Sequence, residues 1–170
     1  GAEVMPLTSD KTALLNKVAG LTAAGGTAGH LGTAWAWYTL SPNWSSLWPT
    51  STPAAYGTPK HQKIAVQMTD GEYNTQYDSN GVSVNQNNYP SCSAAANGCS
   101  TTQARALCTA MKAKGITVYT VGFQVGSNQT AVDTLTQCAT DPSMFYNAAD
   151  GTQLRQAFRD IALKLSSLYL

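Results

Sequence analysis

Apolar positions along the chain follow two periods, and segments with the two periods alternate. Three short apolar runs carry the β-branched and aromatic residues of buried strands. Between them, apolar residues recur every three or four positions, which is the spacing of one helix face. The predicted strands are 64–68, Ile116–Phe123 and 144–147. The first predicted helix is capped by Ser9 or Asp10 and ends at Gly25-Gly26, and the last is capped by Asp150. The helices between them are predicted at about 27–40, 101–114 and 130–139. This alternation predicts an α/β fold with a parallel sheet flanked by helices on both faces.

Two stretches follow neither period and are predicted to be loops. Residues 41–59 are rich in proline, and residues at about 72–100 are polar, with many Asn, Ser, Gly and Tyr. A loop as long as the second is functional or mobile, and its composition suits either an adaptable recognition surface or an inert insertion. Four tryptophans cluster near the first loop. We favour Trp35 in the core, with Trp37, Trp44 and Trp48 packing the loop, over a binding surface.

Length and charge exclude several classes of protein. The 170 residues predict one domain, and charged residues make up only 11% of them, well below the usual quarter. The net charge of +1 includes no basic run, so binding to nucleic acid through counterion release is not expected. No apolar run approaches the ~20 residues of a membrane span. A surface of uncharged polar residues is typical of secreted and cell-surface proteins.

The four cysteines favour disulfides over a metal site. Cys92, Cys99, Cys108 and Cys138 form no C-x-x-C pair and lie far from both histidines in the sequence. Three pairings of two disulfides are possible, and we favour Cys92–Cys99, closing a small loop, with Cys108–Cys138, joining two helices. Two disulfides indicate an oxidising compartment. The alternative is four reduced cysteines, two of them buried in helices.

Candidate chemistry gathers where the first strand ends. The apolar run from Lys63 stops at Asp70, and parallel strands deliver such residues to the edge of a sheet where α/β folds keep their sites. A hydroxyl on the neighbouring loop, from Thr27, adds a second hard oxygen ligand. Such ligands suit Mg²⁺ or Mn²⁺. The plainer interpretations are that Asp70 caps the segment after it and that Thr27 caps a helix.

These motifs, taken in order, resemble a von Willebrand factor A domain. The resemblance rests on Gly25-Gly26-Thr27, on the strand that runs into Thr69-Asp70-Gly71, and on the strand that starts at Gly115-Ile116. More narrowly, the chain is similar to the C-terminal part of TadG-like proteins of Tad/Flp pilus assembly, in Pro6–Lys11 and in the closing strand and helix. The resemblance covers nearly all of the chain outside the loop at about 72–100, and it implies a single domain over 1–170 that lacks the first strand or strands of the family.

The resemblance also implies a metal site built from three loops. The family's first loop carries Asp-x-Ser-x-Ser, the second a Thr and the third an Asp. By position, Thr27 and Asp70 are the second and third of these ligands. The chain has no Asp-x-Ser-x-Ser, and its nearest run, Asp141-Pro142-Ser143, lacks the second serine. We therefore expect this chain alone to bind Mg²⁺ or Mn²⁺ weakly or not at all. The expected binding residues beside the ligands are Gly25, Gly26, Gly71 and Glu72.

The function that the resemblance implies is adhesion or protein binding in a Tad-type pilus system. In the intact protein from which this chain would come, binding would depend on a divalent metal. The resemblance does not imply an enzyme. The partner would be a pilus or envelope component or a surface ligand, in the periplasm or outside the cell, with a membrane anchor outside this chain. A metal-dependent hydrolase using Asp70 and Glu72 is one alternative. The other is a structural, self-associating pilus component without a metal, since the strand at 64–68 would have an open edge.

Overall fold

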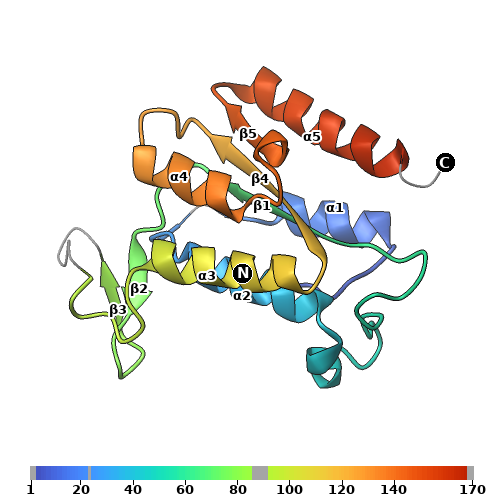
Figure 1. The fold of residues 1–170 in the computed structure, drawn as a ribbon, viewed down its shortest axis with the longest axis horizontal. Coiled ribbons are helices and arrows are strands. Elements are labelled where there is room, and N and C mark those ends of the chain that lie inside the picture. Colours follow the sequence, from blue (N-terminus) through green and yellow to red (C-terminus); the bar gives the residue numbers. More distant parts are fainter. Residues whose placement is uncertain (1–2, 23, 86–91, 168–170) are drawn as a thin grey trace.

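The computed structural model describes residues 3–22, 24–85 and 92–167. In chain order, its elements are α1 (Lys11–Ala19), α2 (Gly29–Leu40), the 3₁₀ helix η1 (Pro42–Leu47), β1 (Lys63–Thr69), β2 (Thr75–Tyr77), β3 (Ser83–Asn85), α3 (Ser100–Ala113), β4 (Ile116–Phe123), α4 (Gln129–Cys138), the 3₁₀ helix η2 (Pro142–Met144), β5 (Phe145–Ala148) and α5 (Gly151–Ser167). Figure 1 shows their arrangement.

A three-stranded parallel sheet in the order β1-β4-β5 organises the molecule, as the sequence pattern predicts. Lys63 of β1 is in register with Ile116 of β4, and Thr120 of β4 with Phe145 of β5. β4 is the middle strand, and most of its residues are buried, which explains its nearly continuous run of β-branched and aromatic residues. The carboxyl ends of the three strands therefore share one edge of the sheet.

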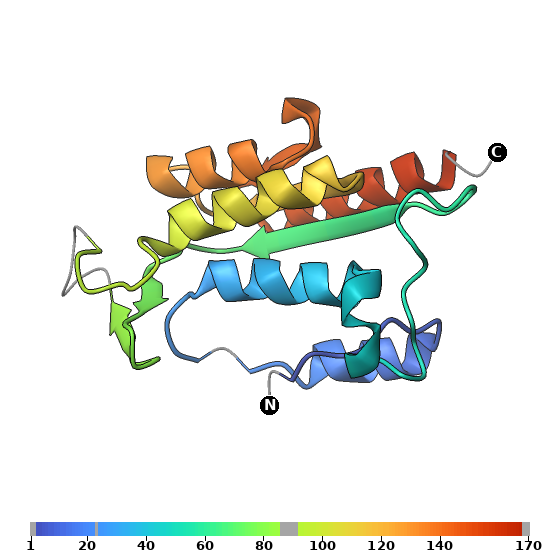
Figure 2. The same ribbon diagram turned by 60° about the horizontal axis from the view of Figure 1, so that its bottom comes forward.

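Helices cover both faces of this sheet (Figures 1 and 2). On one face, Val118 and Ile116 of β4 pack with Met111 of α3, and Thr120 donates a hydrogen bond of 2.9 Å to the Leu135 carbonyl of α4. On the other face, the alternate residues of β4 pack against α5. These two cores hold the sheet between layers of helices, as predicted for the fold class.

The α5 side leaves part of the sheet uncovered. Val66 and Met68 of β1 point away from the buried residues of that strand and are 41% and 47% exposed. They alternate with the buried Ala65, Gln67 and Thr69, whose side chains face α2 and α3. In the described part of the chain, no strand pairs with the second edge of β1. The open edge expected from the sequence is therefore confirmed.

The helix α1 has its predicted start but not its predicted end or surroundings. The Asp10 carboxylate accepts a hydrogen bond of 3.0 Å from the Ala13 backbone N–H, as expected of a cap. The helix ends at Ala19 with Gly20 as its cap, rather than at Gly25-Gly26. Its apolar residues lie largely in solvent, with exposed fractions of 42–66% for Leu14, Leu15 and Val18. The amphipathic spacing predicted the helix correctly, but none of the described residues buries its apolar face.

Both predicted loops contain short elements that the sequence pattern missed. Residues 41–59 begin with η1, and the polar stretch at about 72–100 contains the antiparallel pair β2 and β3. Three-residue strands are too short to show a period of two, so the pattern could not reveal them. Residues 86–91 of that stretch lie outside the described residues.

The core position expected for Trp35 is wrong, because Trp35 is 40% exposed and Trp48 is the buried tryptophan of the cluster. The Trp48 indole N–H donates to the Tyr38 carbonyl at 2.9 Å, and that of Trp37 donates to the Tyr56 hydroxyl at 2.8 Å. The tryptophans thus fasten the proline-rich segment to α2. Helical spacing placed Trp35 on the helix but did not show which side of α2 faces the sheet.

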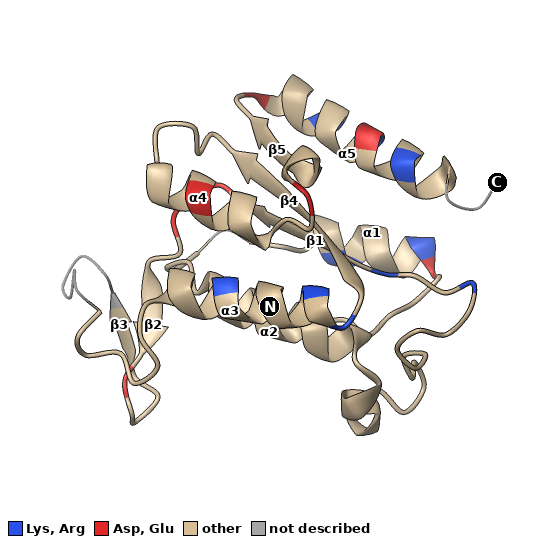
Figure 3. Cartoon of the chain, in the orientation of Figure 1, with Lys and Arg blue, Asp and Glu red and all other residues tan. Residues whose placement is uncertain are grey.

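Charged residues are few and scattered over the ribbon (Figure 3). None of the described helices combines the length and the apolar composition needed to cross a lipid bilayer.

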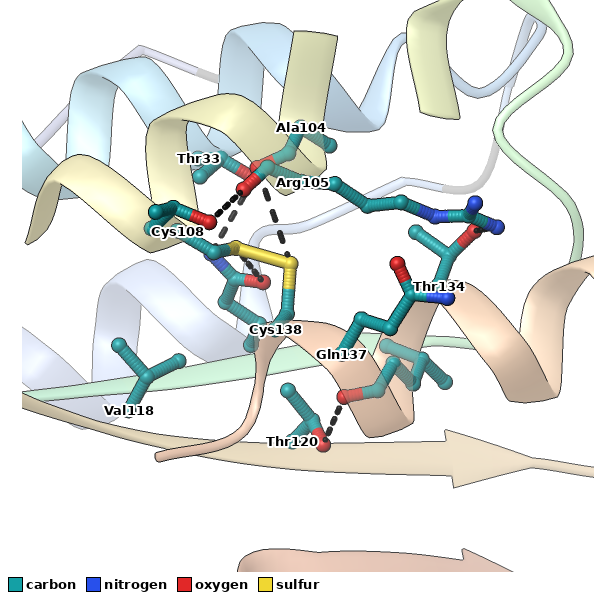
Figure 4. Close-up of a disulfide and its surroundings, with 12 residues drawn as sticks. Thr33, Ala104, Arg105, Cys108, Val118, Thr120, Thr134, Gln137 and Cys138 are labelled. Carbon is teal, nitrogen blue, oxygen red and sulfur yellow. Dashed lines mark hydrogen bonds between the residues drawn. A yellow bond between two sulfur atoms is a disulfide. The ribbon is translucent and has the colours of Figure 1, made fainter. Parts of the chain in front are cut away.

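Both predicted disulfides are present. Cys92–Cys99 joins residues whose Cα atoms are 5.2 Å apart, and Cys108–Cys138 joins α3 to the end of α4 with a Cα separation of 5.0 Å. Cys108 and Cys138 are fully buried, and Figure 4 shows their disulfide above β4, close to Thr120 and Val118. The segment that this disulfide closes includes the whole of β4.

Candidate functional site

A tight turn presents Asp70 at the carboxyl end of β1. The Thr69 hydroxyl donates to the Gly71 carbonyl at 3.0 Å and accepts a bond from the Gly71 backbone N–H at 3.3 Å. These two bonds bend the chain sharply as it leaves the sheet, and Asp70 is exposed at the bend. The strand-then-acid pattern in the sequence is thus realised as a carboxylate at the edge of the sheet.

The loop that carries Thr27 is fastened to the segment that follows this turn. The Thr27 backbone N–H donates to the Asn74 side-chain oxygen at 3.0 Å. The Thr27 carbonyl accepts bonds from the backbone N–H groups of Asn74 and Thr75 at 3.0 and 3.2 Å. Because these contacts use mainly backbone groups, the position of the Thr27 loop beside Asn74 is fixed independently of the Thr27 side chain.

Glycines allow this close approach. Gly25 has a φ of +82°, in the left-handed region that favours glycine. At Gly26, a Cβ atom would overlap the Thr75 hydroxyl, so a larger residue there would require the Thr75 side chain to move. The glycines that the sequence singled out therefore favour the contact between the two loops.

A groove of about 250 Å³ opens beside these loops, along the free edge of β1. Tyr73 lines the groove and is 6% exposed, and its burial raises the pKa of its hydroxyl. No lining residue carries a charge. The lining residues are Thr27, Gly29, Gly32, Thr33, Ala36, Tyr73 and the strand residues Val66, Gln67, Met68 and Thr69.

Thr27 and Asp70 therefore lie at one end of the sheet, since Thr27 and Thr69 line the same groove and Asp70 is the next residue. The plainer interpretation of Thr27 is wrong, because the residue that caps α2 is Ala28 and no side chain bonds there. Nor does the Asp70 carboxylate accept a hydrogen bond from any described residue, so it does not cap the segment after it.

As a donor set for Mg²⁺ or Mn²⁺, the described residues are chemically suitable but too few. Thr27 and Asp70 offer one hydroxyl and one carboxylate, both hard oxygen ligands. Among the residues described, no cluster of three or more His, Cys, Asp or Glu side chains has a geometry that could hold a metal ion. Asp141 is also not part of such a set, because its carboxylate accepts a bond of 2.8 Å from the Ser143 N–H and caps η2.

Glu72 lies two residues beyond Asp70 and contacts a different loop. Its carboxylate accepts a hydrogen bond of 3.2 Å from the Asn128 side chain. Asn128 also caps α4 by accepting from the Ala131 N–H at 2.9 Å, so Glu72 links the β1 turn to the start of α4. Neither Asp70 nor Glu72 lines the groove.

Sequence reasoning missed the residues that fasten this edge of the sheet: Asn74, Tyr73 and Asn128. Each is a polar or aromatic residue in a stretch without periodicity, where nothing in the pattern distinguishes it from its neighbours. Of these three residues, only Asn128 could have been recognised from the sequence, because an Asn before a predicted helix is typical of a helix cap. That pattern does not predict its hydrogen bond to Glu72.

His30 is buried at the start of α2. Its Nδ1 lies 2.7 Å from the Ser100 hydroxyl at the start of α3, and its ring lies near that of Tyr77. Burial lowers the pKa of its imidazole. The pair holds α2 against α3, and both side chains are closed to solvent.

Comparison with known proteins gives a consistent family. The family model of the von Willebrand factor type A domain matches residues 2–160. No curated protein matches the sequence significantly.

Solved structures of two pilus proteins are among those similar to this one. The first is the crystal structure of the vWF domain of Mfa5, a type V pili tip protein from Porphyromonas gingivalis, with a TM-score of 0.67 and 17% identity over 95% of this chain and 74% of that one. The second is the pilus adhesin SpaC from Lactobacillus rhamnosus GG, with a TM-score of 0.63 and 12% identity over 92% of this chain and 21% of that one. At these identities, the likeness is one of fold.

Proposed function

Because the chain belongs to the von Willebrand factor type A domain family, we propose that it is a non-enzymatic binding module that captures a protein or surface ligand at the carboxyl edge of its sheet. The supporting observation is the Thr27 loop, which backbone bonds hold beside the turn at Asp70. An uncommitted hydroxyl and carboxylate thus share one exposed edge.

Binding at this edge would depend on a divalent ion in the intact protein. Thr27 and Asp70 supply two ligands, and the others come from protein outside the described residues, of the Asp-x-Ser-x-Ser kind. A hard cation held with one open position attracts an acidic group, so the ligand class is a carboxylate-bearing protein or surface. Gly25, Gly26, Gly71 and Glu72 shape and border the site.

The setting that we propose is a pilus assembly system of the Tad type, because the sequence resembles that of TadG-like proteins. Mfa5 is a pili tip protein and SpaC is a pilus adhesin, which supports a pilus setting without specifying the system. The two disulfides indicate an oxidising compartment outside the cytosol. Within that setting, we propose a periplasmic or extracellular position.

Calorimetric titration with Mn²⁺ and Mg²⁺ tests the metal site. We expect weak or undetectable heats with the 170-residue chain and clear binding to a longer form that carries an Asp-x-Ser-x-Ser loop. Asp70→Asn and Thr27→Val should each abolish binding to the longer form. Asp160→Asn, which removes an aspartate on α5, should leave it unchanged. Binding that survives the loss of both Thr27 and Asp70 would place the metal elsewhere.

The hydrolase alternative requires Asp70 and Glu72 to act together on a bound substrate. The engagement of Glu72 by Asn128 and the absence of both carboxylates from the lining of the groove argue against it. Turnover of general esterase or phosphatase substrates that disappears in Asp70→Ala would support this alternative instead.

A further inference from the structure

Exposed aromatic side chains of α2 and η1 gather into one surface. Trp35 and Trp44 are each 40% exposed, and both contact the ring of Tyr38. The Trp44 ring stacks on that of Tyr38 with 4.1 Å between the ring centres, and the Trp35 ring meets it edge to face at 5.6 Å. Leu31, one helical turn before Trp35, and Leu47, three residues after Trp44, are exposed as well. We call these five residues the aromatic patch.

Buried contacts fix the rings of the aromatic patch in place. Trp48 is 8% exposed, its indole N–H donates to the Tyr38 carbonyl at 2.9 Å, and its ring centre lies 6.5 Å from that of Trp35. The Trp44 backbone N–H donates to the Ser41 carbonyl at 3.2 Å, which sets the position of Trp44 at the start of η1. Rings that are already held in this way lose little freedom when a ligand binds.

The segment that forms the aromatic patch carries no Asp, Glu, Lys or Arg, because none of these residues occurs in 18–59. Lys63 reaches the end of α2, but it donates to the Leu40 carbonyl at 2.7 Å and lies over the ring of Tyr56, which is not part of the patch. A charged ligand would lose hydration on these rings without meeting an opposite charge from this segment. The aromatic patch therefore favours an uncharged ligand.

Uncharged polar side chains stand next to the exposed rings. Asn43 precedes Trp44 in the chain and Ser46 follows it by two residues, and both are exposed. Their side chains form no hydrogen bond to a described residue. An amide and a hydroxyl both donate and accept hydrogen bonds. The surface thus combines flat apolar rings with neutral hydrogen-bonding groups at their border.

Neutral sugars have the matching chemistry. A pyranose ring with equatorial substituents presents axial C–H bonds on both of its flat faces, and these pack on the electron-rich face of an indole. Its hydroxyls point outward, where amide and hydroxyl side chains can bond to them. A protein partner fits less well, because a stable protein interface takes about 20–30 residues a side and favours Arg among its aromatic residues. The aromatic patch is far smaller and contains no Arg.

We propose that the aromatic patch binds a neutral, β-linked glycan by stacking sugar rings on Trp35 and Trp44. The Thr27 loop precedes α2 and η1 follows it, so the patch lies towards the other end of α2 from the candidate metal ligands (Figure 2). None of the patch residues lines the groove beside β1. Binding here needs neither a divalent ion nor the open edge of β1, so it is a second site, separate from the proposed function.

Calorimetric titration with cellohexaose and chitohexaose, which are neutral and β-linked, tests the proposal. We expect saturable binding of at least one of these sugars, equally with and without EDTA. Trp35→Ala and Trp44→Ala should each weaken that binding about tenfold, because each removes one aromatic contact. Phe158→Ala is the matched control, since it removes a ring that is 42% exposed on α5, and it should leave binding unchanged.

Nuclear magnetic resonance of the indole N–H groups locates the bound sugar. The signals of Trp35 and Trp44 should shift when the sugar is added, whereas that of Trp37, whose N–H donates to the Tyr56 hydroxyl, should not. Trp44→Phe keeps an aromatic face next to Tyr38 and should retain more binding than Trp44→Ala. This comparison distinguishes the loss of a stacking surface from a displacement of η1.

The absence of saturable binding of either sugar by the folded chain would overturn the proposal. Binding that is unchanged in both Trp35→Ala and Trp44→Ala would also overturn it, as would an equal loss in Phe158→Ala, because the sugar would then bind to another surface.

Discussion

Two glycines on α2 face very different surroundings although they are three residues apart. A Cβ atom at Gly29 would overlap the ring of the buried Tyr73, whereas a Cβ at Gly32 would meet nothing within 4 Å. The sequence marks Gly25 and Gly26 by their pairing but cannot distinguish Gly29 from Gly32. The difference depends on where Tyr73 lies, and Tyr73 comes from a segment without a readable pattern.

Substituting these two glycines should therefore have opposite effects. Gly29→Ala should lower the free energy of unfolding by about 1–3 kcal/mol, because Tyr73 has to move. Gly32→Ala should leave it unchanged or raise it by up to about 1 kcal/mol, because alanine is the better helix former. Urea unfolding of both variants at one protein concentration measures this. Equal effects would contradict the close packing of Tyr73 on α2.

The burial of His30 should make stability depend on pH. Its pKa is lowered in the folded state by burial, so the folded protein binds fewer protons there than the unfolded chain does. The stabilising contribution is therefore complete above the unfolded pKa of about 6.5 and is lost as the pH falls through that value towards the folded pKa. The slope is at most about 1.4 kcal/mol per pH unit.

Urea unfolding at a series of pH values between 7.5 and 5, roughly spanning the histidine range, measures this dependence. His30→Gln removes the titrating group and should flatten the profile. His61→Gln changes an exposed histidine and should leave the slope unchanged. An equally steep profile in His30→Gln would assign the dependence to other groups.

At the scale of elements, the sequence predicted the three strands of the main sheet and the five α-helices of the described residues, with most boundaries within one or two residues. Long periodic segments such as α3 carry many positions that agree with one period, so their type is clear. β2, β3 and η1 were missed because each is too short to show a period. The end of α1 was missed because Gly20 gave an earlier stop than the glycine pair.

The two disulfides close loops of different lengths, so their removal should have unequal effects. Replacing Cys108 and Cys138 together by Ala opens a segment of 30 residues and should lower the free energy of unfolding by about 3–4 kcal/mol on the loop-entropy model. Replacing Cys92 and Cys99 opens 7 residues and should cost about 2–3 kcal/mol. Thermal unfolding compares them, and a larger effect from the shorter loop would contradict the loop model.

At the scale of the whole molecule, the fold class followed from the alternation of elements. The place of Asp70 followed from a buried strand that ends in an acid, and the place of Thr27 beside it came from the resemblance to the family. The sequence could not show how the Thr27 loop is held, because Asn74 and Thr75 contribute backbone groups to it. It also could not show that α1 lies outside both cores. Amphipathic spacing reports that a helix has an apolar face, not whether anything covers that face.

The Cys108–Cys138 disulfide has a mechanical consequence for a molecule that is pulled from its ends. The segment between the two cysteines, whose sequence separation is 30, cannot extend under tension because the disulfide joins its ends. This shortens the fully extended chain by about 100 Å. β4 lies wholly inside the segment that the disulfide closes. A stretched molecule can unfold from both termini while the disulfide still links β4 to its two flanking helices. These elements then serve as a template for refolding when the force is removed.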